Sequence, residues 1–114
     1  MTRSLYLAFC LAAVSAAHAA PPAAAAPSGQ AVYEHWCAPC HAPGPGHPGT
    51  QSLQLKYAGK TPAVLLERTD LAPEAVAVFV RQGVLLMAPF RKTEITDAQL
   101  QALSAYVTRN YKPH

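Results

Sequence analysis

The chain has 114 residues and a formal net charge of +3. This length allows one ordinary domain, which excludes a multidomain protein. No run of Lys and Arg provides the basic surface that nucleic-acid binding needs, and the small net charge predicts no long-range electrostatic steering of a partner.

Residues 1–19 have the pattern of a cleaved secretion signal. Arg3 supplies the positive charge, an apolar run extends from Leu5 to Val14, and Ala17-His18-Ala19 fits the cleavage pattern of small residues. The apolar run is about half as long as a membrane span. We therefore expect cleavage after Ala19 or Ala20, a periplasmic protein, and no membrane insertion after cleavage. An uncleaved membrane anchor is the alternative.

Residues 20–28 are almost entirely Ala and Pro. They lack side chains that could form a core, so we expect a disordered leader and a folded domain over residues 29–114. A domain this small is marginal on its own core and usually needs an additional stabilising element. Without Cys10 of the signal peptide, the chain retains Cys37 and Cys40, which are too close in sequence to close a long disulfide loop. We therefore expect a bound cofactor to stabilise the domain.

The domain is predicted to be all-α, with short helices joined by loops rich in Pro and Gly. A first helix is expected over residues 29–37, followed by a loop of helix breakers over residues 43–49. Residues 62–68 are predicted to form a short helix, because Pro62 is well placed at the first helical position. Beta-branched residues never alternate over a strand length, so no sheet is expected.

Two further helices are predicted in the second half of the domain. One begins at Pro73, shows apolar residues at helical spacing and ends at Gly83, and a loop over residues 84–90 follows it. The last helix begins with a capping box, Thr96 to Gln99. The apolar positions of these helices are Val76, Phe79 and Val80 in the first and Leu100, Leu103, Tyr106 and Val107 in the second.

Cys37-Ala38-Pro39-Cys40-His41 is a C-x-x-C-H motif, the attachment signature of haem c. Two thiols add to two vinyl groups on one edge of the porphyrin, and two intervening residues let one turn of chain reach both. The histidine follows directly, so its imidazole lies under the iron. The motif predicts one covalent haem c, attached through Cys37 and Cys40 and ligated by His41.

Two other interpretations of the motif are weaker. A thioredoxin-type redox site also uses C-x-x-C, but it needs a preceding strand and a βαβ frame, and here the preceding segment is predicted to be helical. A zinc site would need further paired ligands. His35 and His47 are available for it, but a second paired motif is missing.

Met87 is the predicted second axial ligand of the iron. It is the one methionine that follows the signal peptide, and Pro89 lies close to it in an apolar loop. A lone Met in an apolar stretch usually fills a gap in the core, but a six-coordinate haem needs this second ligand, and His47 is the alternative. Met/His ligation raises the reduction potential. The haem then supplies the chemistry, so we expect an electron carrier and not an enzyme.

With these residues in place, the chain resembles the class I cytochromes c over nearly the whole mature domain. Gly29 and Tyr33 match the small-then-aromatic pair of that family's first helix, and Leu103 and Tyr106 match the Leu-x-x-aromatic pair of its last helix. The resemblance implies short helices wrapped around one covalent haem. It also implies that the first and last helices cross near Gly29, where a small residue lets the backbones approach.

Two stretches suggest a closer resemblance, residues 37–50 and residues 87–95, together with Arg68-Thr69-Asp70-Leu71. They are similar to the small cytochrome subunit of p-cresol methylhydroxylase and of related 4-alkylphenol or eugenol hydroxylases. In that family the cytochrome docks on a large FAD subunit and accepts single electrons from the flavin. The resemblance implies the same role here, with a periplasmic copper protein or cytochrome as the electron acceptor.

An electron carrier needs one haem edge near the surface. We expect an apolar docking rim around that edge, because the Met87 loop is more apolar than an ordinary surface loop. The docking rim comprises Ala38, Pro39, Leu85, Leu86, Ala88 and Pro89.

Other residues are expected around the haem. Tyr57, Arg91 and Lys92 are candidates to bind the propionates, with simple solvent exposure as the alternative for each, and Trp36 and Phe90 are expected to pack nearby. The second ring nitrogen of His41 needs an acceptor, and a backbone carbonyl within residues 43–50 is expected to provide it.

The main alternative function is a diffusible cytochrome that shuttles electrons between respiratory or dehydrogenase complexes. The shuttle would use the same haem residues as the hydroxylase subunit. Stable association with a flavoprotein is therefore the property that distinguishes these two functions. A sensing haem protein would need an open iron site, against which Met87 argues. A peroxidase would need a second haem motif and a longer chain.

Overall fold

Short helices account for nearly all regular structure in the computed structural model, which describes residues 27–113. The prediction of an all-α fold is confirmed. The signal peptide and most of the leader lie outside the described residues. The elements are α1 (Gly29–Trp36), α2 (Ala38–His41), α3 (Pro48–Tyr57), the 3₁₀ turn η1 (Leu65–Glu67), α4 (Pro73–Gln82) and α5 (Asp97–Val107).

The first and last helices begin with side-chain caps that satisfy free backbone N–H groups. The Oγ of Ser28 accepts a hydrogen bond from the N–H of Ala31 at 3.2 Å. At α5, the N–H of Gln99 donates to Thr96 Oγ1 at 3.2 Å, and the N–H of Thr96 donates to Gln99 Oε1 at 2.8 Å. The capping box predicted from the sequence is therefore present.

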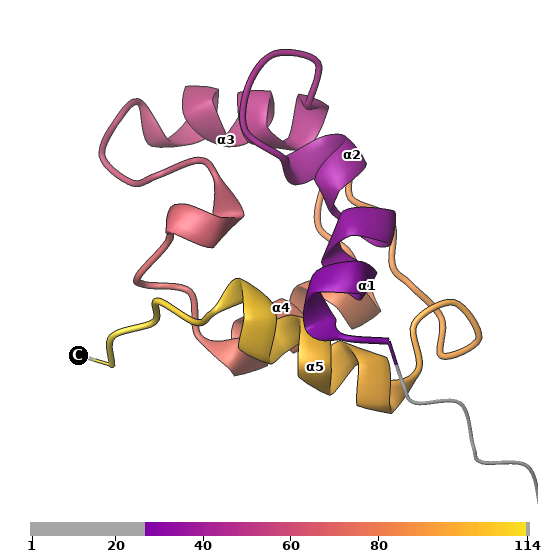
Figure 1. Ribbon diagram of the computed structural model, residues 1–114. Coiled ribbons are helices and arrows are strands. Elements are labelled where there is room, and N and C mark those ends of the chain that lie inside the picture. The colour runs from indigo at the N-terminus through magenta and orange to yellow at the C-terminus, as the bar shows by residue number, and fades with distance from the viewer. Residues whose placement is uncertain (1–26, 114) are drawn as a thin grey trace, which may run out of the picture.

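Helices α1 and α5 pack closely against each other (Figure 1). A Cβ added to Gly29 would collide with the backbone carbonyl of Ala102 and lie 2.8 Å from Tyr106 Cβ. The rings of Tyr33 and Tyr106 lie 5.7 Å apart beside this contact. The predicted crossing at a small residue is confirmed. The buried core around it consists of Val32, Tyr33, Leu71, Val76, Val80, Ile95, Leu100, Leu103 and Val107.

Helix α4 packs against α5 and ends where the sequence predicts. Pro73 occupies the first turn, and no side chain caps that end. Gly83 follows the helix with φ of 70°, a backbone conformation that favours glycine. The chain can therefore turn sharply at this point and lead into the loop that carries Met87.

The first half of the domain differs from the prediction in two places. Residues 48–57 form α3, whereas Pro48 and Gly49 were expected to belong to a loop. Pro48 instead occupies the first turn of the helix, where its missing N–H costs nothing. The helix predicted over residues 62–68 is reduced to the 3₁₀ turn η1. Figure 1 shows α2 and α3 at one end of the domain and α4 and α5 at the other.

A tight turn shapes the loop between α4 and α5. Val84 and Met87 form an isolated antiparallel bridge, in which each N–H donates to the other's carbonyl at 2.9 Å. Leu85 and Leu86 occupy the tip, and Leu85 has φ of 53°. This left-handed conformation is unfavourable for a bulky side chain. The turn leaves both leucines exposed while Met87 returns toward the core.

Candidate haem site

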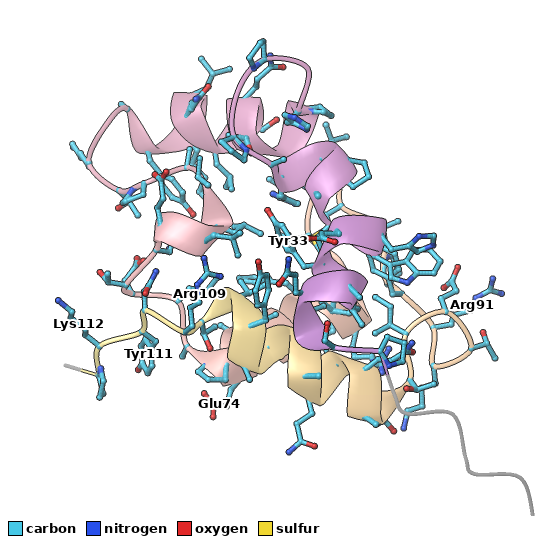
Figure 2. The ribbon with its side chains drawn as sticks, in the orientation of Figure 1. Tyr33, Glu74, Arg91, Arg109, Tyr111 and Lys112 are labelled. Atoms are coloured by element: carbon cyan, nitrogen blue, oxygen red, sulfur yellow. The ribbon has the colours of Figure 1, made fainter. Side chains whose placement is uncertain are left out.

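A cavity lies between α3 and η1 on one side and α4 and α5 on the other. Cofactor pockets commonly have mostly apolar walls. Figure 2 shows the side chains of the surrounding elements. The cavity is lined by Cys37, His41, Leu53, Lys56, Tyr57, Leu65, Arg68, Leu71, Val76, Phe79, Val80, Val84, Met87, Leu103 and Val107.

The two cysteines of the motif have different surroundings. Cys37 lines the cavity and is partly buried, whereas Cys40 is exposed, and the two are not joined by a disulfide. Burial, and secondarily the charge of Cys40, raises the pKa of the Cys37 thiol to about 11. A thioredoxin-type site lowers the pKa of its attacking cysteine. Together with the lack of strands among the described residues, this argues against a thiol–disulfide function.

His41 lines the same cavity at the end of α2. Burial lowers the pKa of its imidazole, which favours the neutral ring that a metal requires. Its Nδ1 is buried, and the described part of the chain supplies no hydrogen-bond partner for it. The predicted backbone acceptor is therefore not seen. The ring packs instead against Gly49, where an added Cβ would lie 2.7 Å from His41 Cε1 and 2.9 Å from Nδ1.

Three contacts fix the turn that carries His41. The hydroxyl of Tyr33 donates to the carbonyl of His41 at 3.1 Å. Thr50, which is fully buried, donates from Oγ1 to the carbonyl of Ala42 at 3.0 Å. His47 Nδ1 lies 3.1 Å from the carbonyl oxygen of Pro39. His47, the alternative axial ligand, therefore contacts the motif from outside the cavity and does not line it.

Met87 lines the cavity together with Cys37 and His41. The Val84–Met87 bridge holds its backbone. A Cβ added to Gly83 would lie 2.5 Å from the carbonyl oxygen of Met87, so the loop can fold back over the end of α4 only because residue 83 is glycine. The structure thus brings three of the four predicted haem residues to one cavity.

The polar residues of the cavity come from α3 and from the segment after η1. Arg68 has an 11% exposed side chain and forms two 2.8 Å contacts with the carboxylate of Asp70. Its Nη1 donates to the hydroxyl of Tyr57 at 2.7 Å. Hydrogen bonding to Asp70 raises the pKa of the Arg68 guanidinium. Lys56 also lines the cavity, so this side offers positive charge and a hydroxyl.

Of the three predicted propionate ligands, only Tyr57 lines the cavity. Arg91 forms a 3.5 Å ion pair with Glu94, and Lys92 forms a 2.8 Å ion pair with Asp97. Figure 2 shows Arg91 projecting from the outer edge of the molecule. Lys56 and Arg68 also line the cavity, and neither was expected to bind the haem, because no local pattern distinguishes them from surface charges.

The predicted aromatic neighbours also lie elsewhere. The rings of Trp36 and Phe90 are 5.6 Å apart, and both pack against the core without lining the cavity. His35 is exposed, as the sequence indicated, and its ring lies edge-on to that of Trp36 at 4.7 Å. These aromatic residues therefore support α1 from outside the cavity.

The docking rim is the most exposed apolar feature of the described residues. The side chains of Leu85 and Leu86 are 93% and 98% exposed, and Pro39, Ala88 and Pro89 are exposed as well. Ala38 is partly buried against the core. Residues 36–55 and 82–90, which include the residues of the docking rim, contain no Asp, Glu, Lys or Arg.

Residues 27–113 contain neither a cluster of metal-binding side chains nor a helix able to span a membrane. No group of three or more His, Cys, Asp or Glu side chains is arranged there to hold a metal ion, which argues against the zinc interpretation. In the same part of the chain, the helices are too short or too polar to span a bilayer.

A small all-α domain that brings the first thiol and the histidine of a C-x-x-C-H motif to one cavity with a methionine defines a class I cytochrome c. A family model described as cytochrome C oxidase, cbb3-type, subunit III matches residues 24–107. Because the match covers well over half of the chain, the chain belongs to this family of c-type cytochrome domains. No curated protein and no solved structure matches the chain.

The family carries one covalently bound haem c and transfers electrons without catalysing a reaction of its own. The cavity fits this cofactor on structural grounds. Its lining is mostly apolar, as a porphyrin face requires, and it contains a thiol, a neutral imidazole and a thioether. Gly49 leaves space for the imidazole that any larger residue would fill.

Proposed function

We propose that Cys37 and Cys40 attach the haem and that His41 and Met87 are its axial ligands. The observation that carries this assignment is the cavity shared by Cys37, His41 and Met87. His41 Nδ1 packs against Gly49, which leaves Nε2 for the iron. A thioether is a known axial ligand of haem iron, and the Val84–Met87 bridge holds the backbone of Met87 beside the cavity.

When bound, the haem iron alternates between its ferric and ferrous states and so holds or releases one electron. The chain's residues set the conditions for this. The aliphatic lining excludes water and lowers the local dielectric constant, which strengthens electrostatic interactions in the site. Arg68 and Tyr57, with Lys56 nearby, provide the donors that would meet the propionate carboxylates.

We further propose that the partner is a FAD-containing hydroxylase subunit of the p-cresol methylhydroxylase type. The flavin would donate electrons singly to this cytochrome, and a periplasmic copper protein or cytochrome would accept them. The sequence resemblance supports this assignment over residues 37–50 and 87–95. The surface around the Met87 loop gives independent support, since it has the composition of a lasting interface.

The docking rim contains no charged side chain and presents two leucines at a strained tip. Transient redox partners usually find each other through complementary charge, which speeds encounter. A permanent subunit interface has a core with few charges and buries large apolar side chains. Leu85 and Leu86 are exposed apolar side chains of the kind that a permanent interface buries, which favours a bound subunit over a shuttle.

The direct test is purification from the native host under mild, anaerobic conditions with the haem oxidised. A flavoprotein subunit is expected to co-purify, and addition of a 4-alkylphenol is expected to reduce the haem rapidly, as followed by its reduced-state absorbance. A flavin-free monomer that stays oxidised would contradict the hydroxylase assignment. In that case the favoured function is the diffusible shuttle, whose natural partner class is the respiratory complex that the family's description names.

The docking rim is tested by Leu86→Glu in the complex. Burial of a charge against the partner is unfavourable, so we expect at least about tenfold weaker association and slower haem reduction. Leu55→Glu is the matched control, because Leu55 is 85% exposed on α3 and lies outside the docking rim. Equal affinity and equal electron-transfer rate in the two variants would show that the rim is not the docking surface.

A further inference from the structure

The loop over residues 83–96 holds Met87, and few contacts fix its course. The Val84–Met87 bridge fixes its beginning. Three residues after Met87, the N–H of Phe90 donates to the carbonyl of Val80 at 2.8 Å. That carbonyl belongs to the last turn of α4 and would otherwise lack a partner within the helix. The position of Met87 therefore depends on how firmly the loop is held against the end of α4.

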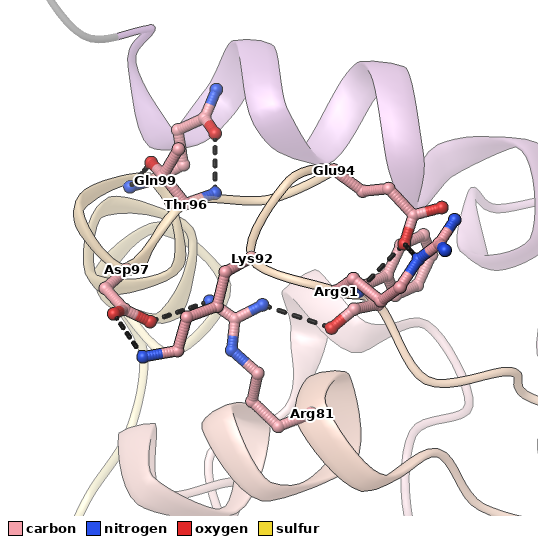
Figure 3. A network of polar contacts seen from close by, with 8 residues as sticks. Arg81, Arg91, Lys92, Glu94, Thr96, Asp97 and Gln99 are labelled. Atoms are coloured by element: carbon pink, nitrogen blue, oxygen red, sulfur yellow. Dashed lines mark hydrogen bonds and ion pairs between the residues drawn. The ribbon is translucent and has the colours of Figure 1, made fainter.

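Arg81 provides the side-chain contact at this point (Figure 3). Its Nη1 donates to the carbonyl of Phe90 at 3.2 Å, and its Nη2 donates to Asp97 Oδ1 at 2.9 Å. Lys92 Nζ donates to the other oxygen of Asp97 at 2.8 Å. Among the described residues, Arg81 is the one whose side chain hydrogen-bonds to residues 83–90. It thus links the end of α4, the loop and the start of α5.

Phe90 is therefore held at both of its backbone polar groups, its N–H by Val80 and its carbonyl by Arg81. These two bonds fix the backbone three residues beyond Met87, while the bridge fixes Met87 itself. Asp97 in turn orients the guanidinium, because a planar Arg fork that donates in two directions keeps one geometry.

We propose that Arg81, oriented by Asp97, is a positioning residue that holds the Met87 thioether on the haem iron. This inference rests on the proposed function, in which Met87 is the sixth ligand. A thioether is a weak ligand, so an external ligand replaces it once the loop can move away. The strength of the Arg81 contacts should therefore set how readily the iron accepts a competing ligand.

The experiment measures imidazole binding to the oxidised holoprotein, together with the methionine-to-iron charge-transfer absorbance of ferric haem. Arg81→Leu keeps an aliphatic side chain but removes both donors. We expect it to bind imidazole about tenfold more tightly than the wild type does. A change of this size corresponds to the free energy of one charge-assisted hydrogen bond. Its reduction potential should fall, because the thioether stabilises ferrous iron. Arg81→Lys, which keeps one donor, should lie between the two.

Arg91→Ala is the matched control, because it removes an equal charge from the loop that Arg81 contacts. The side chain of Arg91 is 82% exposed and pairs with Glu94, and its backbone N–H keeps its 2.8 Å bond to that carboxylate. The wild type and Arg91→Ala should therefore bind imidazole equally. If Arg81→Leu also equals the wild type, the positioning role is wrong.

Met87→Ala separates this failure from a failure of the proposed function. If the wild type lacks the charge-transfer absorbance and binds imidazole as tightly as Met87→Ala, then Met87 is not the ligand. If the wild type shows the absorbance and Arg81→Leu leaves imidazole affinity unchanged, only the positioning role is overturned. Should Arg81→Leu fail to yield holoprotein, Asp97→Asn decides, since it weakens the orientation of Arg81 and should increase imidazole affinity by a smaller factor.

Discussion

Single residues around His41 determine whether the imidazole can occupy its place. Gly49 lies against the ring and has an ordinary backbone conformation, so its lack of a side chain matters for space alone. The same residue was expected to be a loop breaker, and its actual role became visible only when α3 was seen to pack on the motif.

Gly49→Ala should therefore displace the His41 ring. The added Cβ would lie within 3 Å of two ring atoms and of the carbonyl of Cys40. Overpacking of this kind costs about 1–3 kcal/mol. We expect a lower free energy of unfolding in urea together with an altered haem absorbance spectrum. Gly44→Ala is the control, because its φ of 95° makes alanine strained while no atom lies within 4 Å of the new Cβ. Loss of stability with an unaltered spectrum in both variants would contradict the steric role of Gly49.

The residues that we propose to hold the haem could be predicted from the sequence, because a covalent motif imposes its own spacing. Cys37, Cys40 and His41 are adjacent, and Met87 follows from the need for a second ligand. Arg68 and Lys56 were not found, since their role depends on three-dimensional proximity to a cavity. Arg91 and Lys92 were candidates with solvent exposure as the alternative, and they form ion pairs with Glu94 and Asp97 without lining the cavity.

At the scale of elements, the helices α1, α4 and α5, which pack on one another, were predicted, and α3 was not. The pairs of apolar residues in α4 and α5 repeat at helical spacing because they face each other in the core. In α3 the residues that line the cavity are Leu53, Lys56 and Tyr57, which form no clear apolar stripe. A face that is covered by a cofactor does not need the same pattern as a face covered by chain.

The junction between α4 and α5 should respond to acid. Hydrogen bonds from Lys92 and, secondarily, Arg81 lower the pKa of Asp97 from its ordinary value of 3.8. A carboxylate with a lowered pKa contributes stability above its unfolded pKa, and that contribution disappears as the pH falls through its folded pKa. The wild type should therefore lose stability below pH 3.8 more steeply than Asp97→Asn. Thermal unfolding midpoints of both proteins, measured over this pH range, test the prediction. Parallel curves would show that Asp97 contributes nothing to the pH dependence of stability.

At the scale of the whole molecule, the cofactor takes the place of a conventional core. The buried residues cluster around α1, α4 and α5, whereas α3 packs on α2 and faces α4 and α5 across the cavity. An apolar cavity that stays unfilled is destabilising, because its lining residues lack packing partners.

Removal of the covalent attachment should therefore unfold most of the domain. We expect the double variant Cys37→Ser, Cys40→Ser to lack a cooperative thermal transition and to show reduced helical circular dichroism. The reason is that a domain this small has little stability to spare. The haem-loaded wild type is the reference. A cooperative transition with native helical content in the double variant would mean that protein packing alone maintains the fold.

Association through the docking rim should depend little on salt. The segments over residues 36–55 and 82–90 carry no charged side chain, and screening acts only on charges. Affinity for the partner should therefore change less than about threefold when ionic strength rises from 0.05 to 0.5 M, on the order expected without interfacial ion pairs. A loss of tenfold or more would indicate that charges outside the rim guide docking.

The contact between α1 and α5 also determines when the domain can assemble. Val32 and Tyr33 near the beginning of the domain are buried with Leu103 and Val107 near its end. A nascent chain consequently cannot close its core until the final helix has been synthesised. The C-x-x-C-H motif, in contrast, is complete at residue 41. Its thiols therefore remain accessible until the last helix closes the fold around them.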